Sequence, residues 1–310
     1  MTSASVGIVW NPSKIDQDEL RDAVDSVDPD AAATAQWFET SVEDPGRGAA
    51  EAALAAGCDL VLVAGGDGTV RAAAEALAGS GVAMGIVPQG TGNLLARNLD
   101  VPLGNVRKAL ERALDPGQER TIDMGWVEMD NGEPERAFTV MVGFGLDAQM
   151  LSETDDDLKD KAGWLAYVEA IGRAVSASEV VDVTITLDDG EPQQLSAHTL
   201  LIGNCGTLQG GVALLPDALF DDGRLDLLVV SAESPAQWLE TLKTFVWDNG
   251  VRKLFVQDAS AVSSDTAVHL SGEAVRVDLP KPILFEIDGE EVGEISRFAV
   301  RLEPGSLTVR

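Results

Sequence analysis

The stretch of sequence that decides the fold runs from Leu60 to Thr69 and reads LVLVAGGDGT. Its first five residues are all apolar, and a run of this length and composition is typical of a buried strand. Gly65 and Gly66 then permit a sharp turn, and the alanine-rich segment after Thr69 has a strong helix propensity. The pattern therefore predicts a strand that turns at its carboxyl end directly into a helix.

This turn allows two interpretations. Glycine lets the backbone approach a ligand closely, and the start of a helix offers N–H groups that favour an anion such as phosphate. Asp67 lies inside the turn, and a carboxylate tolerates a neighbouring phosphate when a metal ion lies between them. The sequence therefore indicates either a magnesium–nucleotide site or an ordinary strand-to-helix turn in which Asp67 caps a helix.

Two other segments repeat the arrangement. Residues 82–99 begin with a short apolar run and pass through the turn GTGN at 90–93 into a predicted helix. Residues 6–10 are also apolar and are followed by Asn11. Because the carboxyl ends of parallel strands meet at one edge of a sheet, we expect the three turns to converge where open α/β sheets bind ligands.

Residues 1–120 alternate predicted strands with predicted helices. The strands are expected at 6–10, 33–38, 60–64 and 83–87, and the helices at 16–27, 46–56, 69–78, 93–99 and 104–114. This alternation predicts a doubly wound α/β domain with a parallel sheet.

From Thr121 onward, predicted strands follow one another with few helices between them. The strands are expected at 121–128, 136–143, 180–187, 195–203, 225–231, 266–270, 274–278, 283–287 and 296–302, and the helices at 159–177 and 235–247. The pattern predicts a second domain, residues 121–295, that is β-rich and antiparallel.

Together these motifs resemble those of the bacterial diacylglycerol kinase-type lipid kinases, a superfamily that also holds sphingosine and ceramide kinases. The matching segments, in chain order, are NP at 11–12, GGDGT at 65–69, PQGTGN at 88–93, FGLDA at 144–148, GGVALLP at 210–216, DDGRLD at 221–226 and DGE at 288–290. The resemblance implies a nucleotide-binding domain like that of NAD kinases and phosphofructokinases, and a β-sandwich-like lipid-substrate domain. It also implies that a final strand, at about 296–310, returns to the first domain.

The resemblance further implies ATP-dependent transfer of the γ-phosphoryl group to a lipid hydroxyl, most directly from ATP to diacylglycerol to give phosphatidic acid. The residues expected to bind the nucleotide are Asn11, Thr40, Gly65, Gly66, Asp67, Gly68, Thr69, Thr91, Gly92 and Asn93. Asp67 is also expected to bind Mg²⁺ through water, and Thr40 to reach the ribose or the adenine edge.

The late DGE segment is expected to supply the proton acceptor. By resemblance, Asp288 is the general base, and Glu290 positions it or binds metal. Without the resemblance, Asp-Gly between two predicted strands favours a β-hairpin turn. Asp222 is the expected residue of a metal site, although Leu219 occupies a position that is acidic in some members, and SK at 13–14 replaces a common Ser-Gly pair.

The net charge of −30 over 310 residues is the unusual feature of the composition. Such a field repels nucleic acid, so no DNA or RNA partner is expected. An acidic surface that maintains solubility is the simplest explanation, and a high-salt cytoplasm, a neutral lipid substrate or a locally basic docking face are alternatives. Cys58 and Cys205 have no metal-ligand spacing and are expected to be buried free thiols.

No apolar run approaches about 18 residues and no basic flank precedes the first apolar residues, so a cytoplasmic protein with transient, peripheral membrane contact is expected. Residues 236–256 predict an amphipathic helix that either touches the membrane or faces the core. A homodimer is a further possibility. The alternatives to a lipid kinase are an NAD kinase-like phosphotransferase, which shares the GGDGT loop, and a non-catalytic nucleotide or lipid sensor.

Overall fold

The structure is a computed structural model that describes residues 5–145, 180–208, 213–231 and 267–310. The helices predicted at 159–177 and 235–247, and the amphipathic segment 236–256, lie outside the described residues. The chain forms two compact units, one of Met1–Met124 with Glu303–Arg310 and the other of Gly125–Leu302. Within the described ranges, no helix is long and apolar enough to cross a membrane.

The first unit contains a parallel sheet with the strand order β4-β3-β1-β2. Its strands are β1 (Val6–Trp10), β2 (Gln36–Glu39), β3 (Leu60–Gly65) and β4 (Ala83–Pro88). Every neighbouring pair among these strands is parallel, so the four carboxyl ends lie at one edge of the sheet. The end of the last strand, β14 (Glu290–Val309), joins beside β4, where Val309 pairs with Met84.

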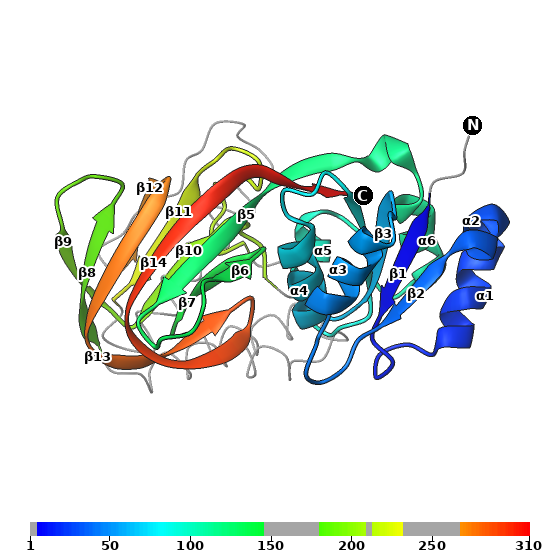
Figure 1. Cartoon of the computed structure of the whole chain (residues 1–310). Helices are drawn as coiled ribbons and strands as arrows, with labels where there is room; N and C mark the ends of the chain where they lie inside the picture. Colours follow the sequence, from blue (N-terminus) through cyan, green and yellow to red (C-terminus); the bar gives the residue numbers. More distant parts are fainter. Residues whose placement is uncertain (1–4, 146–179, 209–212, 232–266) are drawn as a thin grey trace, which may run out of the picture. The chain divides into compact units, whose positions relative to one another are not determined.

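Helices cover both faces of this sheet. They are α1 (Gln17–Val27), α2 (Pro29–Thr34), α3 (Arg47–Ala55), α4 (Asp67–Leu77), α5 (Leu94–Asn98) and α6 (Val106–Ala113), followed by the short 3-10 helix η1 (Pro116–Gln118). α3 packs against α4, and α1 packs against α6. Figure 1 shows these two pairs on opposite faces of the sheet, as in a doubly wound domain.

Burial explains why the central strands are so apolar. Every residue of β1, β3 and β4 is buried, because helices cover the sheet on both sides. Each valine or leucine taken out of water in this way contributes about 1.5–3 kcal/mol to the hydrophobic term of folding.

The predicted start of one strand of this unit is wrong. The strand expected at 33–38 is β2, which begins only at Gln36, because the short helix α2 extends to Thr34. The side chain of Asp28 accepts hydrogen bonds from the N–H groups of Asp30 and Ala31, and Pro29 occupies the first helical position. This cap and the favourable proline start a helix that runs into the first two residues of the predicted strand.

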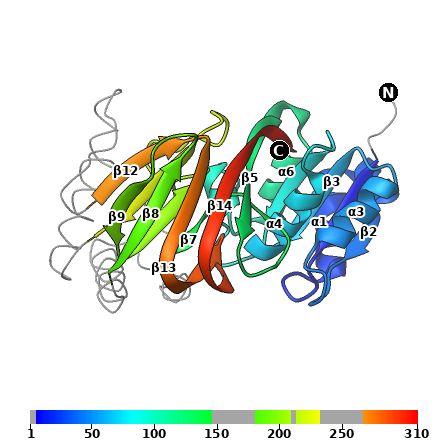
Figure 2. The ribbon, with the colours of Figure 1, turned by 60° about the vertical axis from the view of Figure 1, so that its left-hand side comes forward.

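The second unit is an antiparallel β structure. Its strands are β5 (Arg120–Met129, which begins in the first unit), β6 (Arg136–Phe138), β7 (Met141–Phe144), β8 (Val181–Leu187), β9 (Gln193–Ala197), β10 (Thr199–Gly203), β11 (Leu225–Val230), β12 (Ala267–Gly272), β13 (Ala274–Ile287) and most of β14. One path runs β12-β11-β10-β7-β13-β14, and β13 also pairs with β8, which pairs with β9. Figure 2 shows β9, β8 and β13 side by side in this order.

The long strand β13 connects the two sets of strands because it changes partner along its length. Its first half pairs with β8, and its last residues pair with β7. The register with β14 is interrupted between Asp278 and Ile283, where Pro280 and Pro282 cannot donate ladder hydrogen bonds. The core between the strands includes Phe285 and Phe298, whose ring centroids lie 4.6 Å apart.

The predicted strand boundaries of this unit need four corrections. The run 136–143 is broken at Thr139 and Val140, and the run 195–203 is broken at His198, whose N–H donates to the carbonyl of Val230. The runs 274–278 and 283–287 are one strand, and the strand expected at 296–302 begins already at Glu290. The predicted fold class, a doubly wound α/β unit followed by an antiparallel β-rich unit, is confirmed.

Candidate functional site

The three predicted turns do meet at the carboxyl edge of the parallel sheet. The side-chain amide of Asn11 donates to the hydroxyl of Thr69 over 3.3 Å, which joins the turn after β1 to the start of α4. The N–H of Gln89 donates to the carbonyl of Gly65 over 2.8 Å, which joins the turns after β3 and β4. Thr40, at the end of β2, is only 4% exposed, so its contact with a nucleotide remains a prediction.

Most glycines of these turns serve the packing of one turn on another. A Cβ atom on Gly65 would lie 2.6 Å from the Cβ of Thr69, and one on Gly90 would lie 2.8 Å from the Cα of Gly66. A Cβ on Gly92 would lie 2.8 Å from a carboxylate oxygen of Asp67. By contrast, a Cβ on Gly68 would meet nothing within 4 Å, so Gly68 leaves open space above the first turn of α4.

Asp67 couples the two glycine turns. Its Oδ2 accepts a hydrogen bond from the N–H of Asn93 over 2.7 Å, and its Oδ1 accepts one from the N–H of Leu94 over 2.5 Å. Asp67 is therefore a helix cap, but of α5 rather than of its own helix α4. Its predicted role toward Mg²⁺ remains a prediction.

Asn93 holds the second turn in shape. Its side-chain oxygen accepts from the N–H of Gly90 over 2.8 Å, and its side-chain amide donates to the carbonyl of the same residue. Its φ of 48° lies in the left-handed region, which asparagine tolerates better than most residues. Asn93 is 9% exposed, whereas Thr91 at the tip of the turn is exposed.

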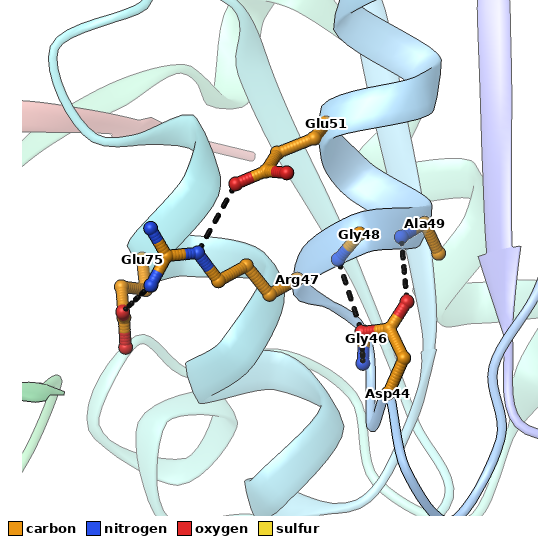
Figure 3. A network of polar contacts seen from close by, with 7 residues as sticks. All are labelled: Asp44, Gly46, Arg47, Gly48, Ala49, Glu51 and Glu75. Atoms are coloured by element: carbon orange, nitrogen blue, oxygen red, sulfur yellow. Dashed lines mark hydrogen bonds and ion pairs between the residues drawn. The ribbon is translucent and has the colours of Figure 1, made fainter.

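Other helices of this unit show what occupies a helix start. The carboxylate of Asp44 accepts hydrogen bonds from the N–H groups of Gly46, Gly48 and Ala49, and so covers the start of α3 (Figure 3). Asp16, Asp28, Asp67 and Asn105 cover the starts of α1, α2, α5 and α6 in the same way. At α4 the N-cap residue is Gly66, which makes no side-chain cap hydrogen bond.

An uncapped helix start between two glycine turns is a place for an anion. The first N–H groups of a helix lack partners within the helix, and the helix dipole adds about half a positive charge there. Open space above Gly68 gives a phosphate access to these groups. The residues present therefore fit the phosphate part of a nucleotide at the start of α4.

Arg47, at the start of α3, is engaged elsewhere. Its Nε contacts Glu51 over 3.1 Å and its guanidinium contacts Glu75 on α4 over 2.6 Å (Figure 3). The hydrogen bond that Arg47 donates to Glu51, and then the charge of Glu75, raise the pKa of Arg47 above its usual value. Arg47 thus joins α3 to α4, with its charge balanced by two carboxylates.

In the second unit, Asp288 is a buried carboxylate with four donors. Its Oδ2 accepts from the N–H and the hydroxyl of Thr139 over 2.8 and 2.9 Å. Its Oδ1 accepts from the N–H groups of Val140 and Met141 over 2.8 and 3.0 Å. Three consecutive N–H groups converging on one anion form a backbone nest, which stabilises the charged carboxylate.

The DGE segment is a hairpin turn, as Asp-Gly alone favoured. β13 ends at Ile287 and β14 starts at Glu290, and the two loop residues Asp288 and Gly289 have φ values of 48° and 82°. Positive φ at both positions is the requirement of the two-residue turn that matches the twist of paired strands. The hairpin does not exclude a catalytic role, so that role remains a prediction for Asp288.

Two predicted metal ligands of the second unit have local partners, and their role toward a metal remains a prediction. Glu290 is exposed and contacts Arg136 over 3.5 Å, while Asp222 accepts from the N–H of Arg224 in a local turn. Leu219, which replaces an acidic residue of some family members, is 55% exposed. In the ranges that the structure describes, no group of three or more His, Cys, Asp or Glu residues could hold a metal ion.

Sequence reasoning missed several residues of both sites. Asp44 lies in a loop of mixed composition, and Thr139 and Asn204 lie inside predicted strands or at their ends. Thr139 and Asn204 are 2% and 0% exposed, and a buried polar side chain needs a hydrogen-bond partner. That rule signals such residues only after burial is known, because their partners are far away in the sequence.

The predicted buried thiols are confirmed. Cys58 and Cys205 are free cysteines, 3% and 2% exposed. Burial raises the pKa of both thiols, and the charge of Asp288 raises that of Cys205 further. Neither thiol is therefore an activated nucleophile.

Comparison with known families agrees with this architecture. Residues 6–127 match the family described as the diacylglycerol kinase catalytic domain. Residues 140–310 match the family described as the YegS C-terminal NAD kinase beta sandwich-like domain. The two matches confirm the sandwich-like character predicted for the second domain.

Curated relatives point the same way. A protein of Pseudomonas aeruginosa (strain UCBPP-PA14) named "Probable lipid kinase YegS-like" is 33% identical over 263 residues, covering 84% of this chain and 78% of that protein. A diacylglycerol kinase of Mycobacterium tuberculosis (strain CDC 1551 / Oshkosh) is 32% identical over 193 residues, covering 62% of each protein. The match therefore spans less than two thirds of the length of this second relative.

A solved structure shows the same fold. The crystal structure of a diacylglycerol kinase from Bacillus anthracis str. Sterne aligns with a TM-score of 0.69 and 22% sequence identity, covering 100% of this chain and 97% of that chain. The resemblance drawn from the motifs is thus confirmed. The chain belongs to the family of diacylglycerol kinases and YegS-like lipid kinases.

Proposed function

We propose that this chain is an ATP-dependent lipid kinase that transfers the γ-phosphoryl group of ATP to a lipid hydroxyl, with diacylglycerol as the acceptor. Membership of a lipid kinase family supports the reaction class. The observation that carries the nucleotide site is the start of α4, which has no side-chain cap and has open space at Gly68. Phosphoryl transfer depends on positioning and charge neutralisation, which such a site supplies.

In this proposal, the nucleotide phosphates lie against the first turn of α4. The N–H groups after Gly66 bind the phosphate oxygens, and the turn at 90–93 supplies further polar contacts from Thr91. Asp67 fixes the relative position of the two turns through its hydrogen bonds to Asn93 and Leu94. Binding the phosphates and holding these turns in place are the two tasks of the residues in the first unit.

Mg²⁺ is part of the proposal, with Asp67 as the residue that would hold it through water. When bound with the nucleotide, the ion would neutralise negative charge that develops on the phosphate oxygens. Asp67 is half-buried beside Gly68, and a carboxylate is the kind of oxygen ligand that Mg²⁺ prefers. For Asp222 and Glu290, no shared donor set in the described residues supports a metal site.

The proton of the lipid hydroxyl must be taken up as its oxygen attacks the γ-phosphorus and the bond to the leaving ADP oxygen breaks. We assign this step to Asp288, whose carboxylate is held in place by the donors of Thr139, Val140 and Met141. Glu290, exposed on the same hairpin, would assist in positioning. Because the acceptor is a membrane lipid, the proposal includes transient contact with a membrane surface.

The test is a transfer assay. The protein is incubated with γ-labelled ATP, Mg²⁺, NAD and mixed micelles that contain diacylglycerol or a total lipid extract, and the products are separated between organic and aqueous phases. Label in phosphatidic acid, lost in Asp288→Asn, is the expected result. Label in another lipid would change the acceptor, label in NADP would indicate an NAD kinase, and ATP binding without transfer would indicate a sensor.

A further inference from the structure

The donors around Asp288 differ in how freely they can move. Three of them are backbone N–H groups of the link between β6 and β7, at Thr139, Val140 and Met141. The fourth is the hydroxyl of Thr139, which lies 2.9 Å from Oδ2. A hydroxyl rotates about its C–O bond and both donates and accepts, whereas an N–H group only donates.

The backbone of this link is fixed from its other side. The carbonyl of Val140 accepts from the N–H groups of Asn204 and Cys205 over 2.8 and 3.1 Å. The carbonyl of Thr139 accepts from the side-chain amide of Asn204 over 3.5 Å. The N–H groups therefore cannot leave the carboxylate of Asp288 without breaking contacts to a second chain segment.

The two oxygens of Asp288 are consequently not equivalent. Oδ1 faces two N–H groups, both fixed, and a proton placed there would point at a donor. Oδ2 faces one fixed N–H group and the hydroxyl of Thr139, which can turn to accept a hydrogen bond from a protonated Oδ2. This asymmetry leaves Oδ2 as the oxygen on which an added proton finds an acceptor, the hydroxyl oxygen of Thr139.

We propose that Thr139 is a positioning residue for the carboxylate of Asp288, and that its hydroxyl makes Oδ2 the oxygen that receives the proton of the acceptor hydroxyl. The inference rests on the proposed function, because it assigns a partner to the proposed general base. Thr139 acts through Asp288 and is 2% exposed, so it has no direct contact with substrate in this role.

The informative variants are Thr139→Val and Thr139→Ser. Valine has a similar shape without the hydroxyl, and serine keeps the hydroxyl without the methyl group. With Thr139→Val we expect kcat for lipid phosphorylation to fall about ten-fold, corresponding to the loss of one hydrogen bond to a charged group, while the affinity for ATP stays unchanged. Thr139→Ser should retain most of the activity.

A pH profile separates positioning from a structural role. The acid limb of the kcat profile should move in Thr139→Val and stay at its wild-type position in Thr139→Ser, because serine keeps the hydroxyl that contacts Oδ2. The titratable and charged neighbours of this turn in the described residues are Cys205, Glu290 and Arg136, and the variants leave them in place. A residue that only stabilised the fold would lower the melting temperature without moving the limb.

A double-variant comparison completes the experiment. In the Asp288→Asn background, Thr139→Val should cause no further loss of activity, because its effect passes through Asp288. An unchanged kcat and pH profile in a folded Thr139→Val protein, an equal loss in Thr139→Ser, or an additive loss with Asp288→Asn would each overturn this inference alone. A wild-type protein that transfers no phosphate to lipid would overturn the proposed function, and this inference with it.

Discussion

Asp67 and Asp288 each precede a glycine in a turn, and each is a candidate catalytic residue, yet the two turns use the carboxylate differently. Asp67 is half-buried and accepts two N–H groups from a neighbouring turn, and so couples two loops of the first unit. Asp288 is 6% exposed and accepts four hydrogen bonds inside the second unit. The comparison shows that the carboxylate of an Asp-Gly segment can connect two loops, as Asp67 does, or hold a single hairpin in place, as Asp288 does. The number of hydrogen-bond donors and the burial of the carboxylate distinguish the two roles.

The largest effect on stability is expected from removal of the Asp288 carboxylate. In Asp288→Ala, four donors lose their acceptor in a buried place, so the free energy of unfolding should fall by about 3 kcal/mol or more. Denaturant unfolding measures the change. Glu290→Gln, an exposed position on the same hairpin, is the matched control and should cost less than about 0.5 kcal/mol. A loss below about 1 kcal/mol in Asp288→Ala would show that the four hydrogen bonds do not anchor the turn.

Substitution of Asp67 should have a smaller effect on stability and a clear effect on nucleotide binding. Asp67→Asn replaces one acceptor oxygen by an amide that faces an N–H donor, so the turn at 90–93 loosens and ATP affinity falls about ten-fold. Calorimetric titration with ATP, with Mg²⁺ and with EDTA, distinguishes the two roles of Asp67. If Asp67 connects the two turns, Asp67→Asn weakens ATP binding under both conditions. If Asp67 acts only through the metal, the substitution weakens ATP binding only with Mg²⁺.

Asp44→Asn provides the matched control for Asp67→Asn. Its carboxylate also accepts backbone N–H groups at a helix start on the same unit, but at α3. The variant should lower the free energy of unfolding by about 1 kcal/mol, the usual contribution of a helix cap, and leave the ATP affinity unchanged. An equal loss of ATP affinity in both variants would mean that general destabilisation, rather than the coupling of the two turns, weakens binding.

The two aspartates also show which features of the sites could be predicted from the sequence and which could not. The strand and turn at 60–69 follow from local pattern, because burial on both faces of a parallel sheet demands a continuous apolar run. The partners of Asp67 lie 26 and 27 positions away, and those of Asp288 lie 147 to 149 positions away. No local periodicity encodes such pairs, so the candidate residues were identified while their actual contacts were not.

The same limit explains the element boundaries that were wrong. The run at 136–143 is apolar enough for one strand, but Thr139 and Val140 turn their N–H groups toward Asp288 instead of a neighbouring strand. In the first unit, the cap from Asp28 starts a helix that extends to Thr34, so the strand predicted from residue 33 begins only at Gln36. In both places a carboxylate competes for backbone N–H groups. The pattern of apolar residues gives no sign of this competition.

Gly68 and Gly90 lie in the two turns that Asp67 connects, and their substitution by alanine should have opposite effects on the free energy of unfolding. Gly68→Ala places a methyl group in open space within α4, so the free energy of unfolding should rise by about 0.5–1 kcal/mol, since alanine favours helix. If phosphate occupies that space, ATP affinity should fall. Gly90→Ala would bring a methyl group against the backbone of Gly66 and should lower the free energy of unfolding by about 1–3 kcal/mol. Thermal unfolding and ATP titration of both variants check this, and an unchanged ATP affinity in Gly68→Ala would place the phosphates elsewhere.

The smallest effect concerns thiol reactivity, with one cysteine in each unit. Burial raises the pKa of Cys58 and Cys205, so at pH 8 little thiolate is present and both should react with iodoacetamide about 100-fold more slowly than in denaturant. The charge of Asp288 also raises the pKa of Cys205, so Asp288→Asn should speed alkylation of Cys205 and leave Cys58 unchanged. Mass spectrometry of the alkylated peptides measures both rates in one sample. Equal acceleration at both cysteines would mean that loss of the Asp288 charge destabilises the whole chain. The effect of Asp288 would then not be confined to the second unit.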